Sequence, residues 1–336
     1  MPFLAFDCEG PLTLNDNAFE YCKAIIPKGD YFFKQISRFD DYLADIKKKE
    51  GYKAGDTLKL ILPFLKLFGA NNKSLREFSK KTLIFLPKIP ENLPKLNKIL
   101  PTFIISTSYK PYLEALAEVT NFPMDHIFCT EIDFDKVKLS SEEAKILKKL
   151  YEEIISLPEI DFPKDATLPS DLPLDLLSIL DRLEEIFFNI IWNLDIGIFL
   201  REVNPIGGSE KAKACEMISK ELSIPFSEGF YTGDSITDMQ ALNLIKENKG
   251  VALSFNGNRY ALRSAEFYAL SREGSLFLDL AKIFLEKGKE GLEKYENFEE
   301  YEFGKIPEDL KVFEKLVEKS ENFRKKVRGE IIGGLG

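Results

Sequence analysis

The sequence predicts a doubly wound α/β protein built on a parallel sheet, and three observations support this. Six short apolar runs have the length and composition of buried strands, at residues 2–6, 102–106, 126–130, 229–233, 250–254 and 266–270. Helical patterns such as "YLEALAEVT" and "KAKACEMISKEL" lie between them, which is the alternation that produces parallel sheets. Each run ends in small or polar residues, as strands do where they reach a ligand-binding edge.

Two long segments and a tail interrupt this alternation. We expect a core made of residues 1–13, 85–135 and 205–270. A first helical insertion would span 14–84, a second would span 136–204, and a charged helical extension would run over 271–336. Insertions that follow the carboxyl ends of strands usually cover the binding edge, so we expect caps rather than additional packing layers.

Composition excludes several classes of protein. The chain has 336 residues, 44% of them apolar, and a net charge of −9, which disfavours a broad nucleic-acid surface. No apolar run reaches the roughly 18–20 residues of a membrane span, and "MPFLAFDCEG" does not resemble a secretory signal. We therefore expect a cytoplasmic protein without membrane insertion.

The cysteines and the histidine offer little catalytic chemistry. Cys8, Cys22, Cys129 and Cys215 are isolated, without the paired spacing of a zinc or redox centre. His126 is the single histidine, and it lacks a partner nearby in the sequence, which favours a structural role and disfavours Ser-His-Asp catalysis.

Four polar features follow the predicted strands or open the helices between them. Asp7 and Glu9 follow the first strand; Ser106, Thr107 and Ser108 follow the second; Lys211 opens a helix; and Asp234 and Asp238 lie in "YTGDSITDMQAL". Each has an ordinary alternative, since serines and aspartates cap helices and lysines are common on surfaces. Together they are expected to converge, because parallel strands end at one edge of the sheet.

Such a convergence predicts a specific chemistry. Clustered carboxylates repel one another, and a hard divalent cation with oxygen ligands relieves the repulsion. A lysine and helix amino termini bind anions. The residues therefore predict a Mg²⁺ site beside a phosphate site, with a carboxylate free to act as nucleophile in phosphoryl transfer.

The order of these motifs resembles the haloacid dehalogenase (HAD) superfamily, and within it the phosphoserine-phosphatase-like members. "FDCEG", the serine after the second strand, the lysine and "GDSITD" occur in the family order, and Lys211 lies 23 residues before Asp234. Lys213 is the alternative lysine. The resemblance covers the three core segments and neither the insertions nor the tail, and it implies a Rossmannoid sheet with caps.

The resemblance also implies roles for these residues. Asp7 would be the nucleophile and a Mg²⁺ ligand, and Glu9 the general acid and base, with its carbonyl as a further ligand. Ser106, Thr107 and Lys211 would bind the phosphoryl group. Asp234 and Asp238 would complete the metal site, and Asn256 in "SFNGNRYAL" would line its rim.

Two residues depart from the usual family pattern. Glu9 stands where Asp is usual, as it also does in phosphoserine phosphatase/homoserine phosphotransferase enzymes, and it carries one more methylene. Pro11 stands where Thr or Val is usual, and its fixed φ stiffens the turn that leads to the first insertion.

Two functions remain open from the sequence. The first is a Mg²⁺-dependent phosphatase or phosphotransferase acting on a small phosphorylated metabolite, with Arg38, Arg76 and Arg201 as candidate anion contacts. The second is a HAD-fold accessory subunit with a protein partner bound through its caps or tail. The layout also resembles an archaeal HAD-type family labelled energy-converting hydrogenase A subunit R, although no iron–sulfur cysteine spacing is present.

Overall fold

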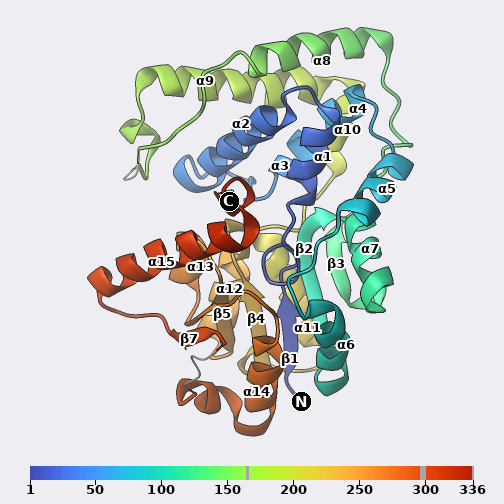
Figure 1. Ribbon diagram of the computed structural model, residues 1–336. Coiled ribbons are helices and arrows are strands. Elements are labelled where there is room, and N and C mark those ends of the chain that lie inside the picture. Colours follow the sequence, from blue (N-terminus) through green and yellow to red (C-terminus); the bar gives the residue numbers. More distant parts are fainter. Residues whose placement is uncertain (164–165, 296–299, 335–336) are drawn as a thin grey trace.

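The computed structural model of the chain describes residues 1–163, 166–295 and 300–334 (Figure 1). Within these ranges seven strands form one sheet in the order β3-β2-β1-β4-β5-β6-β7. Strands β1 to β6 are parallel, and β7 is antiparallel to β6. The strands are β1 (Phe3–Phe6), β2 (Thr102–Tyr109), β3 (Ile127–Thr130), β4 (Gly229–Gly233), β5 (Val251–Phe255), β6 (Phe267–Leu270) and β7 (Glu302–Lys305). The predicted parallel α/β fold is confirmed.

Helices occupy most of the rest of the described chain. They are α1 (Asn17–Ile25), α2 (Gly29–Asp41), α3 (Thr57–Leu60), α4 (Leu62–Leu67), α5 (Asn72–Thr82), α6 (Ile89–Ile99), α7 (Lys110–Thr120), α8 (Ser141–Ile154), α9 (Leu174–Glu184), α10 (Ile198–Glu202), α11 (Ser209–Leu222), α12 (Met239–Glu247), α13 (Arg259–Ser264), α14 (Leu276–Glu293) and α15 (Leu310–Arg328). None of the described helices is long and apolar enough to cross a membrane.

Strand β1 lies in the middle of the sheet and sends side chains to both faces. Its four residues are all buried, which explains why "FLAF" is a continuous apolar run rather than an alternating one. Leu4 and Phe6 pack with residues of α6, α7 and α14 on one face, and Phe3 and Ala5 pack with residues of α11 and α12 on the other. The strand therefore has hydrophobic cover on both sides, and Asp7 leaves the sheet at its carboxyl end.

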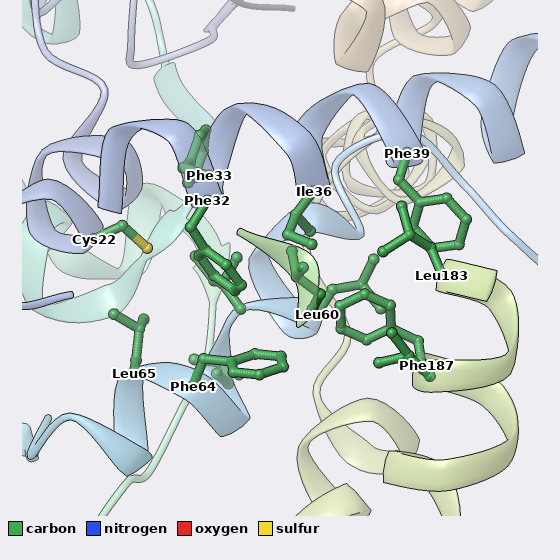
Figure 2. Packing of buried hydrophobic residues seen from close by; sticks show 14 of the residues in the cluster. Cys22, Phe32, Phe33, Ile36, Phe39, Leu60, Phe64, Leu65, Leu183 and Phe187 are labelled. Carbon is green, nitrogen blue, oxygen red and sulfur yellow. The ribbon is translucent and has the colours of Figure 1, made fainter. Parts of the chain in front are cut away.

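The two insertions share one hydrophobic cluster. Residues of α1 to α4 pack with residues of α8 to α10, although the two segments are far apart in the sequence. Phe39 of α2 stacks on Phe187, with ring centroids 5.8 Å apart, and Figure 2 shows these rings beside Leu60 and Leu183. In Figure 1, α8 and α9 lie farthest from the sheet, and α1 and α2 lie between them and the strands. The second insertion thus supports the first, which faces the sheet.

The chain between the first insertion and β2 packs on the sheet. Leu86, Ile89, Leu93 and Leu96 belong to the same cluster as Phe6 of β1. Helix α6 is therefore built as a layer of the core, in keeping with a core segment that begins near residue 85.

The extension after residue 271 contains a strand in addition to its helices. Strand β7 has the sequence "EFGK" and pairs along β6, from Phe267 with Lys305 to Leu270 with Glu302. Its charged residues suit an edge strand but give no apolar run that a sequence pattern would reveal. Helix α15 then returns across the molecule, and the carboxyl end of the described chain lies between the sheet and the first insertion (Figure 1).

Candidate active site

The predicted site residues gather at the carboxyl edge of the sheet. Asp7 follows β1, Ser106 and Thr107 lie in β2, and Asp234 follows β4. The backbone N–H of Asp7 donates to the carbonyl of Thr232, 2.8 Å away, so the parallel pairing of β1 with β4 continues to the nucleophile candidate. A cavity of about 110 Å³ opens here, lined by residues that include Asp7, Glu9, Ser106, Thr107 and Asp234.

Lys211 is buried between two carboxylates. Its Nζ lies 2.8 Å from Oδ2 of Asp7 and 2.7 Å from Oδ1 of Asp238, and its side chain has no solvent exposure. Lys213 is 62% exposed and pairs with Glu210 at 2.7 Å, on the outer side of the helix. Of the two lysines considered, Lys211 is therefore the one at the carboxylates.

Asp238 accepts hydrogen bonds from five donors, one of which is the hydroxyl of Ser235 at 3.4 Å. Its Oδ1 accepts from Lys211 and from the hydroxyl of Tyr231 at 2.7 Å, and its Oδ2 accepts from the backbone N–H groups of Asp234 and Ser235. Burial opposes the charged form, but Lys211 and these hydrogen bonds keep the pKa of Asp238 below its usual range. Asp238 therefore fixes both the lysine and the loop that carries Asp234.

A glycine makes room for Asp234. Gly10 has φ +115°, and a Cβ added there would lie 2.1 Å from Oδ2 of Asp234. The glycine of the first motif thus lets the Asp234 carboxylate lie against the turn that follows β1. Two arginines of helix α15 also contact this carboxylate: Arg324 and, at 3.3 Å, Nη1 of Arg328.

Burial dominates the electrostatics of Asp7. Its low exposure and the charge of Asp238 raise the pKa of Asp7 to about 8, while Lys211 acts to lower it. Burial also raises the pKa of Asp234, against the effect of Arg324 and Arg328. Carboxylates this close are costly to ionise together, and a bound cation is the usual compensation.

The donor set fits a hard divalent cation. Asp7, Asp234 and Asp238 each place one carboxylate oxygen within 4.8 Å of the others, and all three are buried. All of these donors are oxygens, which Mg²⁺ prefers, and the space left by Gly10 lets Asp234 approach the turn after Asp7. The residues present therefore suit Mg²⁺ better than a softer metal.

Glu9 points to the start of the first insertion. Its Oε1 accepts from the backbone N–H of Asn17 at 2.7 Å, at the amino-terminal end of α1. Burial and the nearby charge of Asp16 raise the pKa of Glu9 well above its usual range. Its carboxyl group lines the cavity together with Asp16 and Arg328. Glu9 thus sits where the cap joins the core.

Ser106 and Thr107 belong to the last part of β2. The register of β2 with β3 shifts between Ile105 and Tyr109, so these residues are extended and do not cap the next helix. Oγ of Ser106 accepts from the backbone N–H of Ser108 at 3.1 Å, and Oγ1 of Thr107 donates to the carbonyl of Ile206 at 3.1 Å. The expectation that Ser106, Thr107 and Ser108 follow the strand was wrong, because β2 continues through them and α7 begins only at Lys110.

The side chain of Asn256 forms hydrogen bonds with the backbone of Ser271. Its side chain donates to the carbonyl of Ser271 at 2.7 Å and accepts from the N–H of Ser271 at 3.0 Å. It joins the loops after β5 and β6 and is absent from the described lining of the cavity. Its role at the rim of the site stays a prediction.

Several residues of the cavity were not predicted from the sequence. Arg324 and Arg328 come from α15, and Asp40, Asp41 and Gly55 come from the first insertion. The expected anion contacts Arg38, Arg76 and Arg201 are absent from the described lining of the cavity. Arg38 pairs at 3.4 Å with the lining residue Asp41, Arg76 is exposed on α5, and Arg201 donates to backbone carbonyls of the second insertion. Arg324 and Arg328 are four residues apart and share a helix face, but no local pattern indicates what that face contacts.

Comparison with known proteins agrees with this geometry. No family model matches the chain, and no curated protein matches its sequence. Among solved structures, a substrate-bound phosphoserine phosphatase complex aligns over 83% of this chain and 97% of its own, with a TM-score of 0.50 and 12% identity. A phospho-aspartyl intermediate analogue of phosphoserine phosphatase aligns over 83% of this chain and 98% of its own, also with a TM-score of 0.50 and 12% identity.

The chain has a HAD-like fold. At this identity the likeness establishes the architecture, and the chemistry has to be argued from the site itself. Gene product AF1437 from Archaeoglobus fulgidus is more similar, with 28% identity and a TM-score of 0.85 over 100% of this chain and 99% of its own. That alignment includes the insertions and the tail, so the HAD-like core and its additions form one architecture in both proteins.

Proposed function

We propose that this HAD-like protein is a Mg²⁺-dependent phosphatase or phosphotransferase that acts on a small phosphorylated metabolite through an aspartyl-phosphate. The observation that carries the proposal is the position of Lys211, 2.8 Å from Asp7 and 2.7 Å from Asp238. A fully buried lysine between two carboxylates is expensive to assemble for stability alone. It suits a site where a carboxylate receives a dianionic phosphoryl group.

The reaction would proceed in two balanced steps. In the first, a carboxylate oxygen of Asp7 bonds to phosphorus, the bond from phosphorus to the leaving oxygen breaks, and Glu9 gives its proton to that oxygen. In the second, water bonds to phosphorus as the bond to Asp7 breaks, and Glu9 takes the proton. An acceptor hydroxyl in place of water would make the protein a phosphotransferase.

The surrounding residues would hold the phosphoryl group and the cation. Ser106, Thr107 and Lys211 would contact the phosphoryl oxygens, and Lys211 would offset their charge. Asp7, Asp234, the Glu9 carbonyl and Asp238, directly or through water, would hold Mg²⁺, which neutralises charge on phosphoryl oxygens when bound. Asp238 would also act by fixing Lys211 and the Asp234 loop.

The first insertion limits the size of the substrate. A Cβ added at Gly55 would lie 2.9 Å from Cγ2 of Thr107, so the 54–57 loop lies directly on the phosphoryl-binding strand. Together with a cavity of about 110 Å³, this favours a small phosphorylated compound over a protein or nucleic-acid substrate.

The nucleophile is tested with Asp7→Asn, which keeps the shape of Asp7 and removes its charge. We expect the wild type to hydrolyse a generic phosphate ester only with Mg²⁺, and the variant to lose this turnover. Asp30→Asn, at an exposed acid of α2, is the matched control and should keep it. Unchanged turnover in Asp7→Asn would refute the mechanism.

The role of Glu9 is tested by varying the leaving group. Glu9→Gln should lose about 10²-fold or more in turnover of an alkyl phosphate, which is a usual acid–base contribution. The loss should be smaller for nitrophenyl phosphate, whose leaving group departs without a proton. Equal losses for both substrates would show that Glu9 is not the acid.

A further inference from the structure

Helix α15 lies outside the predicted catalytic core, yet it is docked against the site along its length. Glu314 pairs with Arg259 of α13 at 2.6 Å, and Oγ of Ser320 donates to the carbonyl of Gly257 at 2.6 Å. Four residues further along, Arg324 reaches the loop after β4. Ile332, beyond the helix, packs against the cluster of the insertions. The helix therefore spans from the core, past the active site, to the cap.

Of the arginines that the structure describes, Arg324 alone is buried, with 3% exposure. Its Nη1 donates to the carbonyl of Asp234 at 3.1 Å and also contacts Oδ2 of the same residue. The guanidinium thus holds backbone and side chain of Asp234 at once. A contact of this kind fixes where the carboxylate lies relative to Asp7.

Arg328 joins the same carboxylate to the entry of the first insertion. Its Nη1 lies 3.3 Å from Oδ2 of Asp234, and its Nε donates to the carbonyl of Leu14 at 3.3 Å. Its Nη2 donates to the carbonyl of Asn15. One side chain of the tail therefore contacts both the acidic cluster and the segment that leads into the cap.

The lysine and the two arginines pair with different carboxylates of the site. Lys211 pairs with Asp7 and Asp238, and Arg324 and Arg328 pair with Asp234. A divalent cation at this cluster would approach the same Asp234 carboxylate that the two guanidinium groups contact. Like charges a few ångströms apart in a buried site repel strongly, because water screens them little.

We propose that Arg324 and Arg328 are positioning residues through which helix α15 opposes divalent-cation binding at Asp234. The arginines hold Asp234 in place and supply positive charge there, and a bound cation weakens their hold. Because such coupling is reciprocal, the cation loosens α15 to the same extent that α15 weakens the cation. The proposal rests on the metal site of the proposed function and adds a control element outside the HAD-like core.

The first test measures Mn²⁺ affinity without substrate, by calorimetry and by the electron paramagnetic resonance of free Mn²⁺. We expect Arg328→Gln and Arg324→Gln to bind Mn²⁺ about tenfold or more tightly than the wild type, equivalent to about 1.4 kcal/mol. Arg328→Lys keeps the charge and should stay near the wild-type affinity. Arg259→Gln breaks an ion pair of the same helix away from Asp234, and it should leave the affinity unchanged.

Weaker or unchanged Mn²⁺ binding in the two glutamine variants would overturn the proposal, as would an equal effect of Arg259→Gln. Binding in no variant, the wild type included, would overturn the proposed metal chemistry as well. If the arginine variants change Mn²⁺ affinity as predicted but the wild type hydrolyses no phosphate ester with Mg²⁺, only the proposed reaction would be refuted. The two ideas therefore fail in distinguishable ways.

The second test needs no arginine variant. Amide exchange of residues 310–328 in the full-length wild type should become faster when Mg²⁺ is added. The same addition to Asp234→Asn, which lacks the shared carboxylate charge, should leave that exchange unchanged. Unchanged or slower exchange of α15 in the wild type with saturating Mg²⁺ would overturn the proposal.

Discussion

Lys211 shows how one side chain makes an acidic site possible. It is buried together with Asp7 and Asp238, and desolvated ions of this kind are stable only as partners. Burial acts to lower the pKa of Lys211, but the charges of Asp238 and Asp7 raise it above its usual range. The site therefore depends on this charge before any ligand binds.

Removal of that charge should destabilise the protein. In the presence of a chelator, we expect Lys211→Gln to lower the free energy of unfolding by about 3–5 kcal/mol, because the buried carboxylate of Asp238 loses its counter-ion. Lys213→Gln makes the same change two residues away at an exposed position and should stay within about 0.5 kcal/mol. Denaturant unfolding of both variants measures the difference, and similar losses would contradict this account of the site.

Asp40 should make stability depend on pH. It is buried and accepts hydrogen bonds from Tyr52, Gly55 and Thr57. Burial raises its pKa from 3.8 to about 7, against the hydrogen bond from Tyr52. At a pH between these two pKa values, Asp40 keeps its proton in the folded protein but has released it in the unfolded chain. The contribution of Asp40 to the free energy of unfolding is therefore fully present below about pH 4 and is lost as the pH rises through 7.

The comparison with Asp40→Asn isolates this effect. From pH 5 to pH 7 the wild type should lose free energy of unfolding relative to the variant, at a rate on the order of 1.4 kcal/mol per pH unit. Denaturant unfolding at several pH values gives the two profiles. Parallel profiles would show that Asp40 does not titrate in this range.

The sequence predicted the site residues that follow the strands and missed those that reach the site from elsewhere. Asp7, Ser106 and Asp234 could be predicted because the ends of parallel strands share an edge. Arg324 lies 90 residues from Asp234, and the pairing depends on where α15 crosses the core. Nothing in the local pattern of a charged, amphipathic helix specifies that crossing.

At the scale of elements, the loop before α3 connects the first insertion to the site. Gly55 has φ +94°, and a Cβ added there would lie 2.9 Å from Cγ2 of Thr107 in β2 and 3.3 Å from Cγ2 of Thr237 in the Asp234 loop. Gly207, which precedes α11, approaches the carbonyl of Ala54 so closely that an added Cβ would lie 2.5 Å from it. Because neither Gly55 nor Gly207 has a side chain, the first insertion can contact the carboxyl edge of the sheet.

Gly55→Ala should move the loop before α3 away from Thr107 of β2. Gly51→Ala is the matched control, because Gly51 also has a positive φ, +73°, but no atom lies within 4 Å of an added Cβ. Both variants should lose about 1 kcal/mol of unfolding free energy from the backbone alone. Only Gly55→Ala should also lose turnover of a phosphate ester, since its Cβ displaces the loop from Thr107.

A double variant tests the cause. Thr107→Ser removes the methyl group that lies 2.9 Å from the added Cβ and keeps the hydroxyl. It should therefore restore part of the activity that Gly55→Ala loses, which a double-mutant cycle would detect as coupling. Independent effects of the two substitutions would show that contact with the Thr107 methyl group does not cause the loss of activity.

The strands were easier to predict than the additions to the fold. All six apolar runs became parallel strands, with bounds within a few residues of those expected. Five of them lie inside the sheet, where strands are apolar on both faces, and the sixth, β3, lies at its edge. The edge strand β7 has one large apolar residue, Phe303, and could not be recognised from its pattern. The joint core of the two insertions also could not be predicted, because amphipathic helices do not reveal their partners.

At the scale of the whole molecule, the two insertions act as one body with unequal roles. Their shared cluster joins α2 to α9 and to the π-helical segment Glu185–Ile190, which contains Phe187. The described lining of the cavity includes Phe33, Ser37 and Asp40 of α2, Gly55 of the following loop and Thr57 of α3, but no described residue of 136–204. The second insertion therefore packs behind the first, and only the first contributes described residues to the lining of the cavity.

This division predicts where a reaction-intermediate analogue acts, and it separates the enzyme from an accessory subunit with an inactive site. BeF₃⁻ with Mg²⁺ mimics a phosphorylated Asp7, and an enzyme that closes over its intermediate should respond to the pair. We expect slower amide exchange in residues 33–58 when both are added, a smaller change in 141–190, and little change in either insertion with one component alone. Asp7→Asn, which cannot hold the analogue, should show none of this protection. An accessory subunit would show no such coupling, and a protein partner would protect its insertions in place of the analogue.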